Sequence, residues 1–105
     1  MRDLLSAVSY IHYNDLIHRD IKLENIRFLK LAVIDHIKLL DFGSACFHKR
    51  NSETRHYELS GSPYYCSPEM LSGMGYDEKT DVWSCGIIFH YLLTGSFPYN
   101  GQTDM

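Results

Sequence analysis

The sequence predicts a mixed α+β chain with one β-hairpin, and a chain that forms part of a larger fold. Three observations predict this class. Apolar residues recur at helical spacing near the start, and two apolar runs, 26–29 and 37–42, have the length of strands. Residues 82–93 are apolar on nearly every face, and such a helix belongs at the centre of a protein. A chain of 105 residues is hardly large enough to surround it.

The first predicted element is an amphipathic helix over residues 2–13. Leu4, Val8 and Ile11 recur along one of its faces. Residues 14–25 are polar and show no period, so we expect an irregular loop there.

The hairpin is expected over residues 26–42, with its two strands joined by a turn at 30–36. Residues 43–66 contain glycine, serine, asparagine, threonine and proline without a sustained period. This composition favours a long loop.

A short helix that opens at Ser67 and a central helix over 81–93 complete the predicted elements. Serine, threonine and aspartate are favoured helix caps, proline is favoured in the first turn, and glycine follows helix ends. The capping residues are Ser67 with Pro68 for the short helix and Thr80 or Asp81 for the central helix; the stop signals are Gly73, Gly75, Gly95 and Pro98.

The composition argues against several classes of protein. The net charge is −3 and no basic stripe is present, which argues against nucleic acid as a partner. The three cysteines are far apart and the six histidines lack metal-ligand spacing, so neither a disulfide framework nor a zinc site is indicated. The polar N-terminal residues do not suit a signal peptide, and the most apolar run is too short to span a bilayer. We expect an intracellular, cytoplasmic protein; the sequence does not indicate its oligomeric state.

Three motifs carry the candidate chemistry. In the loop HRDIKLEN, 18–25, Asp20 can accept a proton from an attacking hydroxyl, Lys22 can neutralise phosphate charge, and Asn25 offers an amide oxygen to Mg²⁺. Asp41, in the sequence Asp-Phe-Gly, adds a carboxylate, and a Ser-Pro-Glu motif ends at Glu69. Phosphoryl transfer requires a base, a cation and metal ligands of these kinds. Each residue could instead be an ordinary polar loop residue, but the order and spacing of the three motifs disfavour that reading.

In this order the motifs resemble the middle of a eukaryotic protein kinase domain of the serine/threonine type. HRDIKLEN is similar to the kinase catalytic loop, LLDFGSA to the magnesium-binding segment, and GSPYYCSPE to the end of the activation segment, here 41–69. YDEKTDVWSCGIIFHYLLTGSFPY is similar to the central helix of the large lobe and the segment after it, so the resemblance covers essentially all of residues 1–105. The residue sequences GSPYYCSPE and DVWSCGII are most similar to those of the calcium/calmodulin-dependent and energy-sensing branch of protein kinases.

The resemblance implies a fragment with a protein-kinase-like fold: a mainly α-helical large lobe (α+β) with one hairpin, and no small lobe. It implies ATP and Mg²⁺ as cofactors and proteins with serine or threonine acceptors as substrates. By the same resemblance Asp20 is the catalytic base, Lys22 contacts the transferred phosphate, and Asn25 and Asp41 ligate magnesium. Lys22 and Ser62 are the serine/threonine-specific pattern.

Four further roles are implied by the resemblance alone. Ser62 would bond Asp20 and Lys22, and Asp81 would accept backbone hydrogen bonds from residues 18 and 19. Glu69 pairs in kinases with an arginine from a later segment, which these 105 residues do not contain. Glu58 stands where this branch is usually phosphorylated, so we hypothesise that it pairs with Arg19 and replaces the phosphate. A solvated glutamate of no consequence is the alternative.

Two other departures from the family bear on activity. Arg27 stands where kinases usually have a leucine in the floor of the adenine pocket, and a guanidinium without a partner would be costly to desolvate there. Either this strand is shifted in register or nucleotide binding is impaired. These residues also contain no glycine-rich loop, strand lysine, partner glutamate or hinge, so we expect the isolated chain to be inactive. The alternatives are a non-catalytic, kinase-derived binding fragment and a truncated gene product, which would expose the apolar helix and dissolve poorly.

Overall fold

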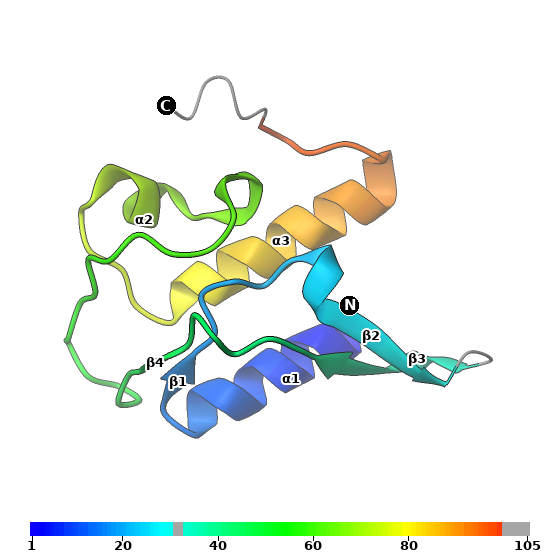
Figure 1. The fold of residues 1–105 in the computed structure, drawn as a ribbon, viewed down its shortest axis with the longest axis horizontal. Coiled ribbons are helices and arrows are strands. Elements are labelled where there is room, and N and C mark those ends of the chain that lie inside the picture. Colours follow the sequence, from blue (N-terminus) through cyan, green and yellow to red (C-terminus); the bar gives the residue numbers. More distant parts are fainter. Residues whose placement is uncertain (31–32, 100–105) are drawn as a thin grey trace.

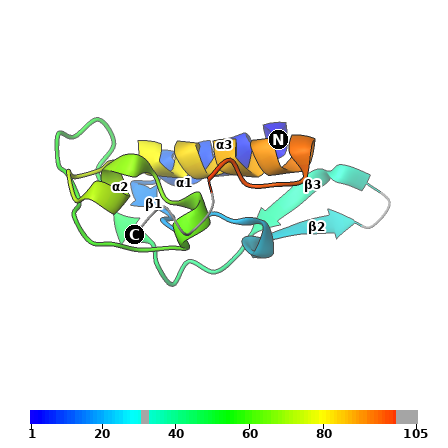
Figure 2. The same cartoon turned by 90° about the horizontal axis from the view of Figure 1, so that it is seen from above.

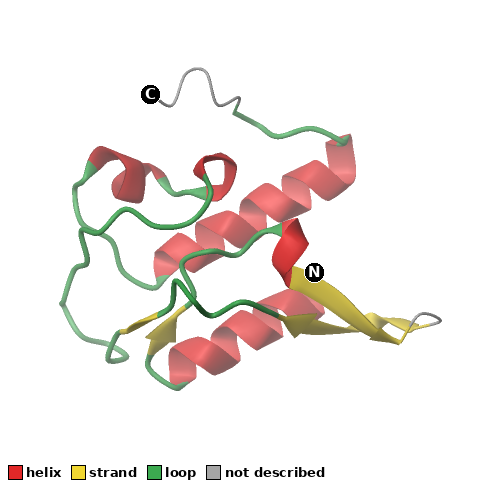
Figure 3. Cartoon of the chain, in the orientation of Figure 1, coloured by secondary structure: helices red, strands yellow, loops and turns green. Residues whose placement is uncertain are grey.

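The structure is a computed structural model that describes residues 1–30 and 33–99; for residues 28–30 and 33–36 the backbone alone is described. Helices, short 3-10 turns and two small antiparallel sheets alternate along the chain (Figures 1 and 3). In chain order the elements are α1 (Arg2–Tyr13), β1 (Leu16–Ile17), η1 (Leu23–Asn25), β2 (Ile26–Lys30), β3 (Val33–Leu39), β4 (Cys46–Phe47), η2 (Pro63–Tyr65), α2 (Pro68–Ser72) and α3 (Lys79–Thr94).

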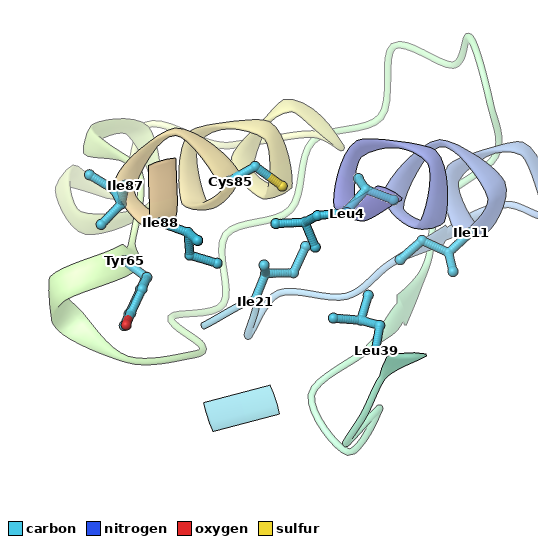
Figure 4. Packing of buried hydrophobic residues seen from close by; sticks show 9 residues of the cluster. Leu4, Ile11, Ile21, Leu39, Tyr65, Cys85, Ile87 and Ile88 are labelled. Carbon is cyan, nitrogen blue, oxygen red and sulfur yellow. The ribbon is translucent and has the colours of Figure 1, made fainter. Parts of the chain in front are cut away.

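The two long helices, α1 and α3, lie together on one side of the molecule, and the hairpin and the loops lie on the other (Figure 2). A single apolar cluster fills the space between these layers (Figure 4). It draws residues from both helices, the catalytic loop, the hairpin and η2: Leu4, Val8, Ile11, Ile21, Leu39, Tyr65, Cys85, Ile87 and Ile88. The catalytic loop therefore rests on the core by way of Ile21, which is fully buried.

α1 covers the same residues as the predicted helix. Leu4, Val8 and Ile11 are its buried face, and they place it against the core. The helix ends at Tyr13 because the chain turns sharply at Asp15, which has a φ of 64°. The chain then enters β1.

The hairpin differs from the prediction in both strands: β2 includes Lys30, which we expected in the turn, and the second strand has other bounds. β2 and β3 pair antiparallel with Ile26 opposite Leu39 and Arg27 opposite Lys38. β3 begins at Val33, so residues 33–36, which we expected in the turn, belong to the strand, and residues 31–32 lie outside the described residues. The strand ends at Leu39 and not at Phe42, because Asp41 has a φ of 57° and cannot continue an extended strand.

A second, smaller sheet was not predicted. β1 and β4 pair antiparallel, with Leu16 opposite Phe47 and Ile17 opposite Cys46. This ladder joins the start of the catalytic loop to the activation segment, within residues that we expected to be irregular. A bridge between His56 and Tyr76 also fastens the activation segment to the approach of α3.

The two C-terminal helices are capped in different ways. The Ser67 side chain accepts a hydrogen bond from the Met70 amide, and α2 ends at Gly73 with a φ of 75°. α3 begins earlier than predicted, at Lys79, and its cap residue Glu78 makes no side-chain capping bond. Thr80 and Asp81 are therefore not caps but buried residues of the first turn.

α3 is apolar all round, as the sequence shows, but it is covered on one side only. Ile87 and Ile88 are buried in the core, whereas several apolar residues remain about half exposed or more: Val82, Phe89, Leu92 and Leu93. No helix within residues 1–30 and 33–99 is long and apolar enough to cross a bilayer.

Candidate active site

Three predicted site residues meet at the junction of the catalytic loop and the activation segment. Lys22 Nζ donates to Ser62 Oγ at 3.0 Å, and Ser62 Oγ donates to Asp20 Oδ1 at 3.3 Å. Lys22 Nζ also lies 3.7 Å from Asp20 Oδ2. A carboxylate, an ammonium group and a hydroxyl therefore share one small region, where the carboxylate can take a proton and the ammonium group can neutralise an anion.

Asp81, in the first turn of α3, fixes the start of the catalytic loop. Its carboxylate is fully buried, with Oδ2 accepting from the His18 amide at 2.8 Å and Oδ1 accepting from the Arg19 amide at 2.9 Å. His12 Nε2 lies 2.9 Å from Oδ2. Arg19 has a φ of 71°, which is a strained conformation for a residue other than glycine. The two hydrogen bonds from the His18 and Arg19 amides to Asp81 hold this turn in place before Asp20. The sequence indicated Asp81 but not His12. Nothing in the sequence except the place of His12 on the predicted helix could have pointed to this contact.

His18 connects the catalytic loop to the end of the hairpin. Its Nε2 lies 2.9 Å from the Leu40 carbonyl oxygen, and its Nδ1 accepts from the Asp20 amide at 3.1 Å. The ring also meets Phe42 edge-on, with centroids 4.8 Å apart. This buried histidine sets the backbone of Asp20 relative to the Asp-Phe-Gly motif.

Asn25 and Asp41 each offer a side-chain oxygen to a cation. Asn25 Nδ2 donates to the Asp20 carbonyl at 2.8 Å, so the amide oxygen is the Asn25 side-chain atom that could bind a cation, and the Leu40 amide donates to the Asn25 carbonyl at 2.8 Å. Asp41 Oδ1 accepts from the Gly43 amide at 3.1 Å. Amide and carboxylate oxygens are the hard donors that Mg²⁺ prefers, and the ion commonly completes its shell with water and phosphate oxygens.

Arg19 connects the catalytic loop to the rest of the activation segment. Nη1 lies 3.1 Å from Glu58 Oε1 and donates to Tyr76 Oη at 3.1 Å, and Nε donates to the Ser44 carbonyl at 2.6 Å. Burial alone would lower the pKa of the Arg19 guanidinium, but the bonds to Tyr76 and Glu58 raise it above its ordinary value. The cation therefore stays charged and holds three segments together.

Gly61 brings the activation segment into direct contact with the catalytic loop. Its φ is +88°, and a Cβ atom at this position would lie 2.4 Å from the Arg19 carbonyl oxygen. Only glycine fits this approach, which places Ser62 beside Asp20 and Lys22.

Arg27 and Glu69 lie outside this group. The Arg27 side chain is exposed, so the desolvation cost that we associated with this position does not arise, and its Nη1 donates to the carbonyls of Glu24 and Ile26 at 2.9 and 3.1 Å. Among the residues that the structure describes, the Glu69 carboxylate makes no ion pair.

Comparison with known proteins places these residues among well-described relatives. The family model described as "Protein kinase domain" matches residues 1–105. The chain is 39% identical over 106 residues to calcium-dependent protein kinase 5 of Plasmodium berghei (strain Anka) and 38% identical over 105 residues to calcium-dependent protein kinase 4 of Plasmodium falciparum (isolate 3D7). These matches cover 99% of the chain but only 18% and 19% of the relatives, so the chain spans about a fifth of their length.

Proposed function

Because this chain belongs to the protein kinase family, we propose that it forms part of a serine/threonine protein kinase, which transfers the γ-phosphate of ATP to the hydroxyl groups of protein substrates. The observation that carries the proposal is the hydrogen-bonded group of Asp20, Ser62 and Lys22. In this reading the chain forms the front half of the large lobe and acts in the cytoplasm.

The chemistry that we propose for each residue rests on the resemblance to protein kinases, and the contacts of these residues are compatible with it. Asp20 orients the attacking hydroxyl and takes its proton. Lys22 neutralises negative charge on the transferred phosphate. Asn25 and Asp41 would hold Mg²⁺, which when bound screens the phosphates and orients them. Ser62 fixes the distance between Asp20 and Lys22, so it is a positioning residue.

Phosphate transfer by the full gene product to a serine or threonine peptide tests this proposal. Asp20→Asn should lower kcat by at least about 100-fold, because general base catalysis typically contributes that much. Glu53→Gln, an exposed change in the activation segment, serves as the control. Equal activity of Asp20→Asn and the unchanged protein would overturn the assignment.

A non-catalytic role remains the competing proposal, in which a kinase-derived fragment binds a partner protein without transferring phosphate. We propose that the 105-residue chain alone lacks activity, because these residues include no glycine-rich loop and no strand lysine. Calorimetry of the purified chain with Mg²⁺ and ATP distinguishes the alternatives. Tight nucleotide binding would contradict the binding-fragment view, and absence of transfer by the full gene product would favour it.

We also propose that Glu58 replaces an activation-segment phosphate. Its carboxylate contacts Arg19 at 3.1 Å although its side chain is 74% exposed. A carboxylate carries less charge than a phosphate, so the ordering it supplies should be weaker but permanent.

Glu58→Ala in the full gene product tests this role, because it should lower kcat/KM without any phosphatase treatment. Glu53→Ala is the matched control, since it removes the same charge from the same segment. Unchanged activity of Glu58→Ala would show that the contact has no regulatory role.

A further inference from the structure

Two histidines and a glutamate form a cluster that the candidate active site does not use. Nδ1 of His48 lies 2.9 Å from Nε2 of His56, and Nε2 of His48 lies 2.8 Å from Oε2 of Glu78. The second contact has the distance of an ion pair, which it forms only when His48 is protonated, and it lacks the alignment of a hydrogen bond. His48 follows β4 and is 4% exposed, His56 lies in the activation segment, and Glu78 precedes α3. The cluster therefore joins three segments that are distant in sequence.

The backbone around the cluster is also fixed. The His48 amide donates to the Asp15 carbonyl at 2.8 Å. His56 and Tyr76 exchange two backbone hydrogen bonds of 2.9 Å each, and their rings lie 5.9 Å apart. The Tyr76 hydroxyl in turn accepts from Arg19. Tyr76 therefore connects the histidine cluster to the network behind the catalytic loop.

The facing nitrogens limit how many protons the closed cluster can hold. One proton must lie between His48 Nδ1 and His56 Nε2, because a hydrogen bond needs one donor and one lone pair. The carboxylate of Glu78 only accepts, so it favours a proton on His48 Nε2. The closed pair can therefore carry one extra proton. A second would place two N–H groups opposite each other at 2.9 Å.

We propose that His48, His56 and Glu78 form a proton-sensitive latch, which fastens residues 48–58 of the activation segment to the start of α3 and opens when both imidazoles are protonated. The groups that face the latch are Glu78 on one side of His48, and Tyr76 and Arg19 near His56. The Asp15 carbonyl accepts from the His48 amide, and the Asp15 carboxylate accepts from the Arg50 amide at 2.9 Å.

The direction of the pH dependence follows from the charges. Burial, and then the positive charges of His48 and Arg19, lower the pKa of His56. A lowered histidine pKa means that the closed state binds fewer protons than the open state. Free imidazoles titrate near pH 6.5. The latch is therefore at full strength above about pH 6.5 and weakens as the pH falls below that value.

Amide hydrogen exchange of the full chain, measured by NMR between pH 7.5 and 5.5, tests the latch. The His56 and Tyr76 amides report its opening because they bond across the bridge. After correction for intrinsic exchange, their protection factors should fall about tenfold from pH 6.5 to 5.5, since opening takes up one more proton than the closed pair holds. His56→Gln, whose amide can still donate to His48 but does not titrate, should keep its protection throughout. His90→Gln, near the C-terminal end of α3, is the matched control and should behave as the unchanged chain.

Glu78→Gln provides a second and independent variant. Removal of the carboxylate charge weakens the singly protonated closed pair, so opening should shift to higher pH. An unchanged opening pH in Glu78→Gln, or an equal loss of protection in His56→Gln and in the unchanged chain, would overturn the proposal. The measurement tracks the backbone and not phosphate transfer, so it stands apart from the proposed kinase activity.

Discussion

Gly61 shows how a single residue without a side chain can determine the geometry of the site. The contact between the activation segment and the catalytic loop is so close that any Cβ would strike the Arg19 carbonyl oxygen. Ser62 then follows at the one place where its hydroxyl reaches both Asp20 and Lys22.

Gly61→Ala should therefore destabilise the protein by roughly 2–4 kcal/mol, from the left-handed backbone and the steric clash together. Gly73→Ala is a matched control, because its φ is also positive, +75°, but no atom lies within 4 Å of the added Cβ. Gly73→Ala should lower the free energy of unfolding by only about 1–2 kcal/mol. Urea denaturation of both variants measures the difference. Equal losses would mean that the approach at Gly61 relaxes without cost.

The sequence could indicate Asp20, Lys22 and Asn25 because these residues stand together in one short motif with a chemical logic. It could not indicate His12 or Tyr76. Each contacts the site through the tertiary fold, and His12 meets Asp81 from 69 positions away. No local pattern records which face of α1 will meet a particular carboxylate of α3.

At the scale of elements, Asp81 joins α3, α1 and the catalytic loop in one buried contact. Asp81→Asn replaces one accepting oxygen by an NH₂ group that faces either the His18 N donor at Oδ2 or the Arg19 N donor at Oδ1. We expect a loss of roughly 3–5 kcal/mol, because a buried, charge-assisted network is broken on one side.

Thermal unfolding of Asp81→Asn beside Glu53→Gln checks this expectation, since both changes remove one carboxylate but only the first is buried. A melting temperature within the error of the control would show that the network contributes nothing measurable to folding.

α3 also leaves an apolar stripe in solvent, on which Val82, Phe89 and Leu93 stand seven and four residues apart. Leu93→Lys should reduce self-association of the chain while changing its stability by less than about 0.5 kcal/mol. Light scattering at several concentrations and a parallel melt measure both effects. Ile88→Lys, on the buried side of the same helix, should unfold the chain; normal folding of that variant would contradict the burial of this face.

Elements with a clear period were the ones that the sequence could predict. α1 has the predicted bounds because three apolar residues define its face. The β1–β4 ladder has only two residues on each strand, too few to show any alternation. The sequence predicts the end of β3 too late because Leu40 and Phe42 prolong the apolar run, whereas the positive φ of Asp41 ends the extended backbone.

Considered as a whole, the molecule shields its three cysteines unequally. Cys85 is 1% exposed within the core, and burial raises its pKa to about 12, whereas Cys46 and Cys66 are partly exposed. Only the thiolate reacts with alkylating agents.

At pH 8 the reactive fraction of the Cys85 thiol should be lower than that of an ordinary cysteine by roughly three orders of magnitude. Iodoacetamide pulses followed by mass spectrometry should therefore label Cys46 and Cys66 before Cys85, which should react only as fast as the whole chain unfolds. Simultaneous labelling of Cys85 and Cys66 in the folded chain would show that the core opens locally.

The contact between Asp81 and the catalytic loop also bears on how the protein is made. The His18 amide and its acceptor are 63 residues apart, so the ribosome delivers the loop well before it delivers the residue that holds it. Synthesis proceeds at about 5–20 residues per second, so roughly 3–13 seconds pass between synthesis of the loop and synthesis of Asp81. During this time no hydrogen bond from Asp81 supports the strained turn. Non-local contacts of this kind slow folding, and they leave the apolar core exposed in the interval. A nascent chain stalled before Asp81 should therefore bind chaperones more strongly than one stalled after α3.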